Sequence, residues 1–422
     1  MKLLVFAHTP PPHHGQSYMV KLMLNGFGGD HRRGRHPPGA FGIECYHVNA
    51  RYSQTLEDIG AFQGGKIFLI LFYCLQAIWC RFRYGVENFY YVPAPGKSVA
   101  LYRDWLVMLV CRPFFKKIIL HWHAAGLAKW LETSVQIRTR ALTYRLFQPV
   151  DSSIVLSRYN FADAEKLLSR QICAVSNGIP DPCPDFTTSL LPRRQARFVL
   201  RKKAFAAGQS DSPELDQAGD DPRIVKILYL AHCTREKGLF AAMEGVIAAN
   251  RRLAAQHSAL RLNLIVAGNF LTITERTAFD SRLKTPEFAA AVSYRGFISG
   301  AEKEQALREA DLFCFPTQYL GENQPVNLIE AMAFGLPIIT TCWRSLPEML
   351  PAHYPGLVVG QSPEPIADAL LAVMTRETGE RLREIFLDQF TVERHLARLA
   401  EAIRSVENAG MTPAGQSAMQ KL

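Results

Sequence analysis

The sequence has 422 residues, enough for two domains of typical size, about 100–200 residues each. Hydrophobic residues make up 48% and charged residues 20%, which excludes a chain that is mainly disordered. Residues 1–185 carry 21 Lys and Arg against 12 Asp and Glu, residues 186–205 hold six basic residues and no acid, and residues 206–422 carry 21 against 26. This asymmetry predicts two domains with different partners, the basic one facing nucleic acid or an anionic membrane surface.

The cysteines and the first residues of the chain indicate the cellular compartment of the protein. The nine cysteines form no CxxC pair and several stand inside apolar runs, which predicts reduced, mostly buried thiols and no zinc site. The opening MKLLVFAHTP has only five apolar residues between Lys2 and His8, too few for a signal peptide. We therefore expect a cytoplasmic protein.

The first half alternates strand and helix patterns. An apolar run at 2–8 ends in the loop TPPPHHG, which contains Gly15, and a helical pattern covers 16–24. This order is typical of the start of a doubly wound α/β domain. Further parallel strands are expected at 89–92, 117–121, 153–156 and 174–175.

The longest apolar stretch is Ile67–Cys80, in which Gln76 is the only clearly polar residue. As a helix it would span about 21 Å, less than the ~30 Å hydrocarbon core of a bilayer. It is either a buried helix or an interfacial helix, the second because Lys66 and Arg81 flank it.

Residues 186–222 have the composition of a linker or inserted loop. The basic piece 193–203 is either a solvated helix face or an attachment site for acidic lipid or substrate. The piece after it is rich in Gly, Ser, Pro and Asp, as mobile linkers are.

The second half repeats the α/β pattern, which predicts a second Rossmann-like domain. Strands are expected at 226–231, 262–267, 292–297, 312–316 and 337–341, and helices at 239–253, 301–310, 325–334, 363–373 and 392–406.

The densest functional signal is GENQPVNLIEAMAFGLPIITT, residues 321–341. Pro325 suits the first helical turn, Asn323 can cap it, and Gly335 suits a left-handed stop. The backbone N–H groups of Val326 and Asn327, with the helix dipole, would then form an anion site.

Two glutamates accompany this helix. Glu322 precedes it and Glu330 lies one to two turns inside it, so the pair can bracket one extended ligand. Carboxylates repel phosphate, so their natural partners are hydroxyls, one on a sugar and one on a ribose. Each glutamate taken singly is more often a surface residue, but Glu330 stands among apolar neighbours.

The segment ENQPVNLIEAMAFGLPII resembles the donor-site motif of retaining glycosyltransferases with the GT-B fold, in particular the family-four group, glycosyl transferases group 1. In that family two glutamates stand at this spacing, and an EAM segment with glycine and proline follows the second. LYLAHCTREKGL, LNLIVAGNF and YRGFISGAEKEQALREADLFCFPTQYLGE resemble neighbouring elements of the same domain. LSRYN with VSNGIPD resembles the end of the N-terminal domain, and residues 30–110 match weakly.

The resemblance implies two Rossmann-like domains that face a central cleft. The acceptor-side domain would be 1–185, the linker 186–221 and the donor domain 222–390. A last helix, about 391–407, would pack back on the first domain, and 408–422 would be a disordered tail. Closure on the donor would use hinges in 186–222 and near Phe390.

The resemblance also implies roles for particular residues. Lys237 would bind the donor diphosphate, Glu322 the transferred sugar and its transition state, and Glu330 the ribose. The remaining donor contacts would come from the backbone around Phe297 and Ile298 to the base, from the N–H groups of Val326 and Asn327 to the phosphates or sugar, and from Gly15 through close approach of the first loop.

The resemblance leaves the roles of three histidines open: His121, His123 and His232. A family histidine that contacts the sugar corresponds to His123 or to His121, which share one side if the strand continues. A two-histidine metal site lacks a third ligand. Where many relatives have a phosphate-binding arginine, this chain has His232, and Arg235 is a candidate replacement.

The implied reaction moves a sugar, with retention, from a nucleoside diphosphate sugar to an acceptor hydroxyl, a glycan or lipid-linked molecule of cell-surface polysaccharide assembly. The sequence has no DxD motif, so we expect no metal and no other cofactor. We expect peripheral attachment to the inner membrane face.

The alternative to a glycosyltransferase is a non-catalytic nucleotide-sugar binder or membrane-surface partner of an assembly complex. Nucleic acid is not expected, because only Phe198 and Phe205 interrupt the basic run.

Overall fold

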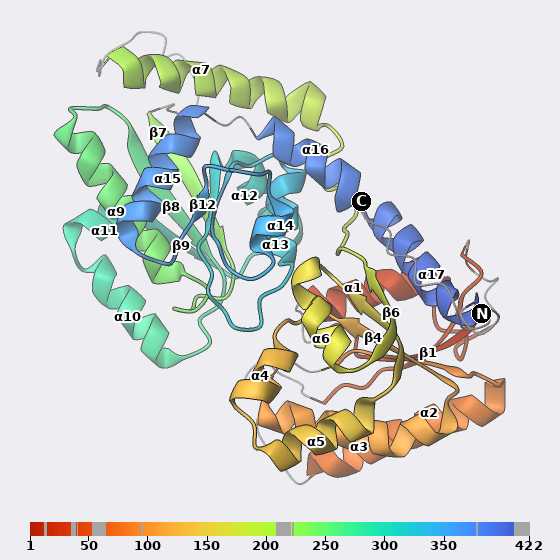
Figure 1. Ribbon diagram of the computed structural model, residues 1–422. Helices are drawn as coiled ribbons and strands as arrows, with labels where there is room; N and C mark the ends of the chain where they lie inside the picture. The colour runs from red at the N-terminus through yellow and green to blue at the C-terminus, as the bar shows by residue number, and fades with distance from the viewer. Residues whose placement is uncertain are drawn as a thin grey trace. The chain divides into compact units, whose positions relative to one another are not determined.

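The computed structural model describes residues 1–11, 15–34, 39, 41–52, 65–93, 96–207, 221, 223–376 and 379–408. The chain forms two compact units (Figure 1). The first comprises Met1–Val175 and the chain from His395 onward, and the second comprises Ser176–Arg394.

The first unit is built on a six-stranded sheet in which every strand pair is parallel, in the order β2-β1-β3-β4-β5-β6. Its strands are β1 (Lys2–Phe6), β2 (Glu44–Val48), β3 (Asn88–Tyr91), β4 (Lys117–Trp122), β5 (Val150–Val155) and β6 (Ser169–Ala174). The order reverses between β1 and β3, and in open α/β sheets ligands bind at the carboxyl ends of the strands beside such a reversal.

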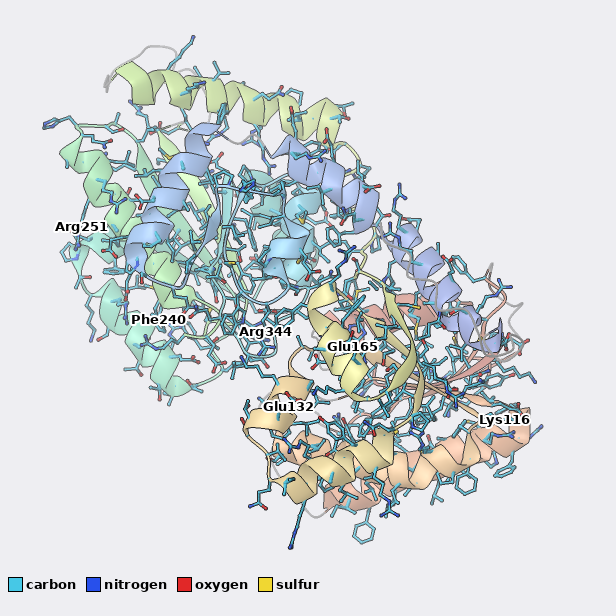
Figure 2. All side chains as sticks on the ribbon, in the orientation of Figure 1. Lys116, Glu132, Glu165, Phe240, Arg251 and Arg344 are labelled. Atoms are coloured by element: carbon cyan, nitrogen blue, oxygen red, sulfur yellow. The ribbon has the colours of Figure 1, made fainter. Side chains whose placement is uncertain are left out.

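One helical layer of this unit consists of α2 (Gly65–Tyr84), α3 (Ser98–Cys111) and α5 (Ile137–Phe147), with α2 packed on α3 and α3 on α5. Its inner side chains and the sheet form a continuous apolar core. Figure 2 shows aromatic side chains on the outer side of this layer as well. The stretch predicted as either buried or interfacial is therefore one helix with two apolar faces.

The other helices of the first unit are α1 (Gly15–Gly26), α4 (Leu127–Thr133), α6 (Phe161–Lys166) and the final α17 (Val392–Asn408). From His395 onward α17 belongs to this unit. A Cβ built on Gly26 would lie 2.3 Å from Leu396 Cδ1, so α1 and α17 pack closely. Ser405 Oγ also donates to Gln171 Oε1 at 3.0 Å, which ties α17 to β6.

The second unit repeats the design with the all-parallel order β12-β11-β10-β7-β8-β9. Its strands are β7 (Ile224–Leu230), β8 (Arg261–Ala267), β9 (Val292–Gly296), β10 (Leu312–Phe315), β11 (Ile338–Thr341) and β12 (Leu357–Val358). The order reverses between β7 and β10. Its helices after β7 are α9 (Leu239–Ala255), α10 (Ile273–Leu283), α11 (Pro286–Ala291), α12 (Gly300–Glu309), α13 (Val326–Ala333), α14 (Leu346–Met349), α15 (Pro363–Arg376) and α16 (Glu380–Gln389). Two such sheets confirm the predicted α/β class.

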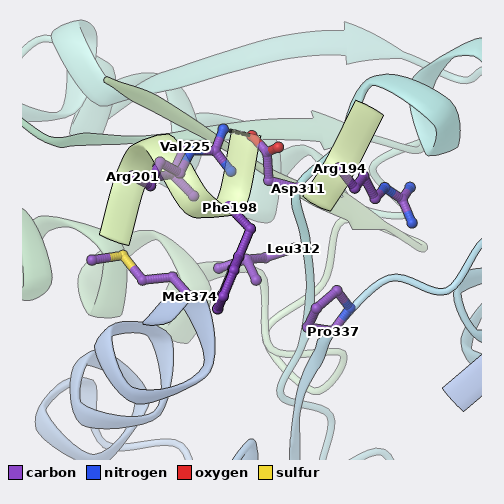
Figure 3. A pocket seen from close by; sticks show the side chains of 8 residues that line it. All are labelled: Arg194, Phe198, Arg201, Val225, Asp311, Leu312, Pro337 and Met374. Atoms are coloured by element: carbon purple, nitrogen blue, oxygen red, sulfur yellow. Dashed lines mark hydrogen bonds and ion pairs between the residues drawn. The ribbon is translucent and has the colours of Figure 1, made fainter. Parts of the chain in front are cut away.

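The segment predicted as a linker is different in the structure. Residues 186–190 form a π-helical turn and α7 (Leu191–Ala207) follows, both inside the second unit. Arg201 lies 2.5 Å from Asp311 (Figure 3). Arg197 Nε lies 3.4 Å from the same carboxylate. The linker prediction was wrong here, because Arg197 and Arg201 are each 8% exposed and pair with the buried side chain of Asp311 beside β10. Arg193, Lys202 and Lys203 on the same helix are exposed, as a solvated helix face would be. The Gly- and Ser-rich piece, 208–220, lies outside the described residues.

The chain crosses between the units after Val175 and returns at His395. Near these points the Ile179 N–H donates to the Phe390 carbonyl, and the Val392 N–H donates to the Ile179 carbonyl, both at 2.9 Å. The two crossing segments are therefore paired with each other rather than separate.

Candidate functional site

The candidate site of the second unit lies where its strand order reverses. Asn327, in the first turn of α13, donates through Nδ2 to the carbonyl of Leu230 at 2.7 Å. Leu230 ends β7, and Phe315 ends the neighbouring β10. The N-terminus of α13 is thereby fixed at the carboxyl ends of these strands, where this class of sheet binds ligands.

Lys237 and Glu322 form an ion pair at this edge, with Nζ 2.7 Å from Oε2. The same carboxylate oxygen accepts from Thr317 Oγ1 at 3.1 Å. The lysine ammonium also lies 4.3 Å from the ring centre of Tyr319, within the range of a cation–π contact. The lysine side chain is 18% exposed and that of the glutamate 8%, so the pair is partly withdrawn from water and can still be reached.

The loop that carries Lys237 is held in place by its backbone. Gly238 has φ +85°, and a Cβ there would lie 2.3 Å from the carbonyl oxygen of Pro316. The Lys237 N–H donates to Thr234 Oγ1 at 3.2 Å, and the Gln318 N–H donates to the Glu236 carbonyl at 2.8 Å. Only glycine permits this approach between the two loops, so the Lys–Gly sequence positions the ammonium.

Glu330 has a different partner. It lies on α13, and Lys303 Nζ on α12 approaches its Oε1 to 2.5 Å. Each glutamate is therefore paired with its own lysine, Glu322 with Lys237 and Glu330 with Lys303. Helix α13 ends as predicted, because Gly335 has φ +56° directly after Phe334.

The start of α13 differs in detail from the prediction. The helix has eight residues from Val326, and Pro325 occupies the cap position without a side-chain hydrogen bond. Asn323 does not cap it; its carbonyl accepts from Ser345 Oγ. Gln324 instead receives two hydrogen bonds from Asn177, at 2.9 and 3.0 Å. The first helical N–H groups, at Val326 and Asn327, are thus left without side-chain capping.

His232 and Arg235 precede Lys237 in the same loop. Burial, and secondly the nearby Lys237 charge, lower the pKa of His232, so the ring is neutral at physiological pH. Arg235 is exposed, and its guanidinium lies 5.2 Å from the ring centre of Phe240. Its backbone N–H donates to Glu275 Oε1 at 3.0 Å.

Phe297 and Ile298 follow β9 at the same edge of the sheet. Phe297 is 61% exposed, whereas Ile298 is 4% exposed and belongs to the core. Gly296 and Gly300, with φ +73° and +54°, bound this turn. Of the two residues assigned to a base, Phe297 presents its side chain and Ile298 can present only its backbone.

In the first unit, the two predicted histidines adopt distinct environments at the end of β4. His121 is 1% exposed, its Nδ1 shares a hydrogen bond of 2.5 Å with the Tyr90 hydroxyl, and burial holds its pKa well below the usual value. The His123 ring lies against it with ring centres 4.2 Å apart and planes tilted by 40°, and His123 is partly exposed. Of these two, His123 is the one a ligand can reach. Gly15, the exposed first residue of α1, follows a loop whose residues 12–14 lie outside the described part.

Several residues of the site were missed by sequence reasoning. Lys303, Thr317 and Tyr319 complete the surroundings of the two glutamates. Thr317 and Tyr319 stand directly after an apolar strand, a position that signals ligand contact, but Lys303 has no local signal. Across the described ranges, no group of three or more His, Cys, Asp or Glu side chains could hold a metal ion.

Comparison with known proteins adds to this geometry. Residues 215–386 match the family model described as glycosyl transferases group 1. A glycosyltransferase named for colanic acid biosynthesis, WcaL of Salmonella typhimurium, is 27% identical over 197 residues, 42% of this chain and 45% of the relative. The amylovoran biosynthesis glycosyltransferase AmsK of Erwinia amylovora is 30% identical over 156 residues, 36% of this chain and 35% of the relative. The matches thus span about half or less of these relatives.

Solved structures resemble the chain over nearly its whole length. Sucrose-phosphate synthase from Thermosynechococcus elongatus superimposes with a TM-score of 0.62 at 16% identity, covering 97% of this chain and all of that one. HepE of Anabaena, solved in complex with UDP, gives 0.60 at 14% identity, covering 96% and 100%. At such identities the likeness establishes the fold, which is the GT-B fold.

Proposed function

We propose, on the premise that residues 215–386 are a glycosyl transferases group 1 domain in a chain with the GT-B fold, that this protein is a retaining glycosyltransferase. It would move a sugar from a nucleoside diphosphate sugar to an acceptor hydroxyl. The departing diphosphate oxygen can take the acceptor proton on the same face of the sugar, so no separate base is needed.

The observation that supports this best is the Lys237–Glu322 pair beside the uncapped N-terminus of α13. An ammonium and free helix N–H groups stabilise negative charge, which is what a departing diphosphate develops. The neighbouring carboxylate suits the hydroxyls of the sugar. The Lys237 ammonium and the helix N–H groups supply the positive charge that the diphosphate needs, so we propose a reaction without a metal ion.

Nucleoside recognition is proposed for Glu330, in the second turn of α13, and for Phe297, in the loop after β9. Glu330 would accept hydrogen bonds from the ribose hydroxyls, and Lys303 orients that carboxylate through an ion pair of 2.5 Å. The exposed Phe297 ring offers a planar surface to a base. HepE of Anabaena binds UDP and, in a second structure, UDP-glucose, which makes a uridine nucleotide the first donor to test.

The acceptor is proposed to be a glycan or lipid-linked molecule of cell-surface polysaccharide assembly at the cytoplasmic face of the membrane. WcaL and AmsK are named for biosynthesis of two polysaccharides, colanic acid and amylovoran. His123 is proposed to contact the sugar, and exchange for Ala should then lower turnover without unfolding the chain.

One observation favours the second candidate, a non-catalytic nucleotide-sugar binder. His232 stands where the resemblance places a phosphate-binding arginine, and its lowered pKa leaves it uncharged. Arg235, which would have to compensate, lies over Phe240.

The test is a thermal shift with UDP-, GDP-, ADP- and TDP-sugars, followed by measurement of nucleoside diphosphate release. Binding at 100 times the dissociation constant adds ~2.7 kcal/mol of stability. We expect a shift with one nucleotide that Lys237→Ala and Glu330→Ala abolish and the exposed control Lys284→Ala retains. A shift with no release in the presence of lipid-linked glycan acceptors would favour the binder, and no shift with any donor would refute both candidates.

A further inference from the structure

Helix α2 presents an apolar stripe that no other part of the described chain covers. The stripe consists of five side chains that are 53–76% exposed: Phe68, Phe72, Leu75, Trp79 and Phe82. Their spacing of four, three, four and three residues places them on one face of the helix over about 21 Å. The opposite face, including Cys74, Ala77 and Cys80, is fully buried in the core.

The stripe continues onto the neighbouring elements. The rings of Phe82 and Phe114 meet edge to face with centres 6.1 Å apart. On α3, which packs against α2, Tyr102 is 52% and Leu109 is 62% exposed. We call these eight side chains the outer face, and Figure 2 shows aromatic side chains projecting from this side of the first unit. An apolar surface of this extent marks an interaction site.

The helical layer behind this face is strongly basic. Residues 65–147 contain twelve Lys and Arg against three Asp and Glu. Each of the three acids is paired: Glu87 with Lys116 at 2.8 Å, Asp104 with Arg103 at 2.7 Å, and Glu132 with Lys166. Lys116, labelled in Figure 2, is still 67% exposed, and Arg83, Arg138 and Arg145 are exposed.

This combination fits one occupant better than another. A second copy of the chain would bring two like-charged layers together, which costs free energy. A bilayer with anionic lipids instead matches the charge, and it accepts aromatic side chains at the level of its headgroups. Residues 67–84 are long and apolar enough to span a membrane by length and composition. Spanning would, however, pull Cys74, Ala77 and Cys80 out of the core, so the helix would have to lie along the surface.

We propose that the outer face binds the surface of an anionic bilayer, with the α2 stripe inserted at the boundary between headgroups and acyl chains and the basic residues in contact with lipid phosphates. Such binding would hold the first unit beside substrates confined to the membrane. The inference rests on the first unit alone and does not require the glycosyltransferase assignment.

The test is flotation of the full chain with phosphatidylcholine vesicles and with vesicles containing 30 mol% phosphatidylglycerol. We expect binding to the anionic vesicles that weakens as salt is raised. Phe72→Gln/Leu75→Gln/Trp79→Gln should reduce it at least tenfold. Arg83→Glu/Arg138→Glu should also reduce it, by more than the roughly fivefold expected for each neutralised charge. The matched control Ile273→Gln/Val359→Gln, at residues 79% and 83% exposed in the second unit, should bind normally.

A second measurement does not depend on how a triple variant folds. Trp79 is 53% exposed, and its fluorescence should be quenched by lipids brominated on the acyl chains. Trp79→Phe should keep vesicle binding but lose most of this quenching. The proposal is overturned if vesicles do not bind, or if the triple variant instead turns a dimer into a monomer. It is also overturned if membrane-bound protein resists alkaline carbonate extraction, since the helix would then span the bilayer.

Discussion

The Lys237 ammonium lies 2.7 Å from the Glu322 carboxylate although 85 residues separate them in the chain. Lys237 lies in the loop after β7 and Glu322 in the loop after β10, so the pair joins two loops at the carboxyl edge of the second sheet. Under the proposed function, a diphosphate that reaches this edge meets a lysine already engaged by a carboxylate, and the two anions compete for the ammonium in an exchange of partners.

The first prediction concerns this exchange. Lys237→Met leaves the 8%-exposed Glu322 side chain without its cation, and it should lower stability by about 1–3 kcal/mol. The double variant Lys237→Met/Glu322→Gln should recover most of that loss, because no uncompensated charge remains. Thermal unfolding of the ligand-free variants measures both effects, and additive losses would show that the pair is not coupled.

The second prediction concerns Glu330 and ribose. Glu330→Gln should weaken binding of the preferred nucleoside diphosphate by about 10–100-fold, the value of hydrogen bonds to a charged group. Affinity for its 2′,3′-dideoxy analogue should change much less, because the hydroxyls are missing. Calorimetric titration of both ligands gives the comparison, with Glu309→Gln on α12 as the control. Equal losses for both nucleotides would remove Glu330 from ribose recognition.

The third prediction concerns the ion cluster under α7. Burial alone would raise the pKa of Asp311, but Arg201 and Arg197 hold it below its usual value. A depressed carboxyl pKa contributes stability that is present at neutral pH and is lost as the pH falls below about 4. Asp311→Asn should therefore cost roughly 3–5 kcal/mol at pH 7 and much less at pH 3, measured by denaturant titration.

A matched exposed pair serves as the control for Asp311. Asp280 pairs with Arg276 at 2.8 Å, but both side chains are more than 40% exposed. Asp280→Asn should cost less than about 1 kcal/mol at either pH, since exposed pairs are screened by water. Similar losses at Asp311 and Asp280 would mean that α7 is not held by the buried cluster.

The fourth prediction concerns acid sensitivity of the first unit. Burial lowers the pKa of His47 to about 4, although its Nε2–H donates to the Ala7 carbonyl at 2.7 Å. Between the unfolded pKa near 6.5 and that value, the unfolded chain binds the extra proton, so stability falls as the pH falls. His47→Gln, which can still donate, should remove roughly 2 kcal/mol of the loss between pH 7 and pH 5. Unchanged pH dependence in denaturant titrations would contradict this.

Much of the second unit could be predicted from the sequence. Its five main strands, α13, the Gly335 stop and the two glutamates were located because apolar periodicity and turn residues are local signals. The strands of the first unit were harder to predict. Strand β2 was missed, because it has only five residues, 44–48, and includes the polar His47. Lys303 was missed as well, since a lysine on a charged helix looks the same whether or not a carboxylate 27 residues away faces it.

Local sequence patterns are enough to give the α/β class, the two-part design and the spacing that sets Glu322 before a helix and Glu330 inside it, because these depend on neighbours a few residues apart. Long-range packing instead sets which lysine pairs with each glutamate, the pairing of Arg201 with an acid 110 residues away, and the burial of α2 on one face but not on the other. These contacts follow from the order in which the strands assemble, which brings together residues whose separation in the chain leaves no periodic signal.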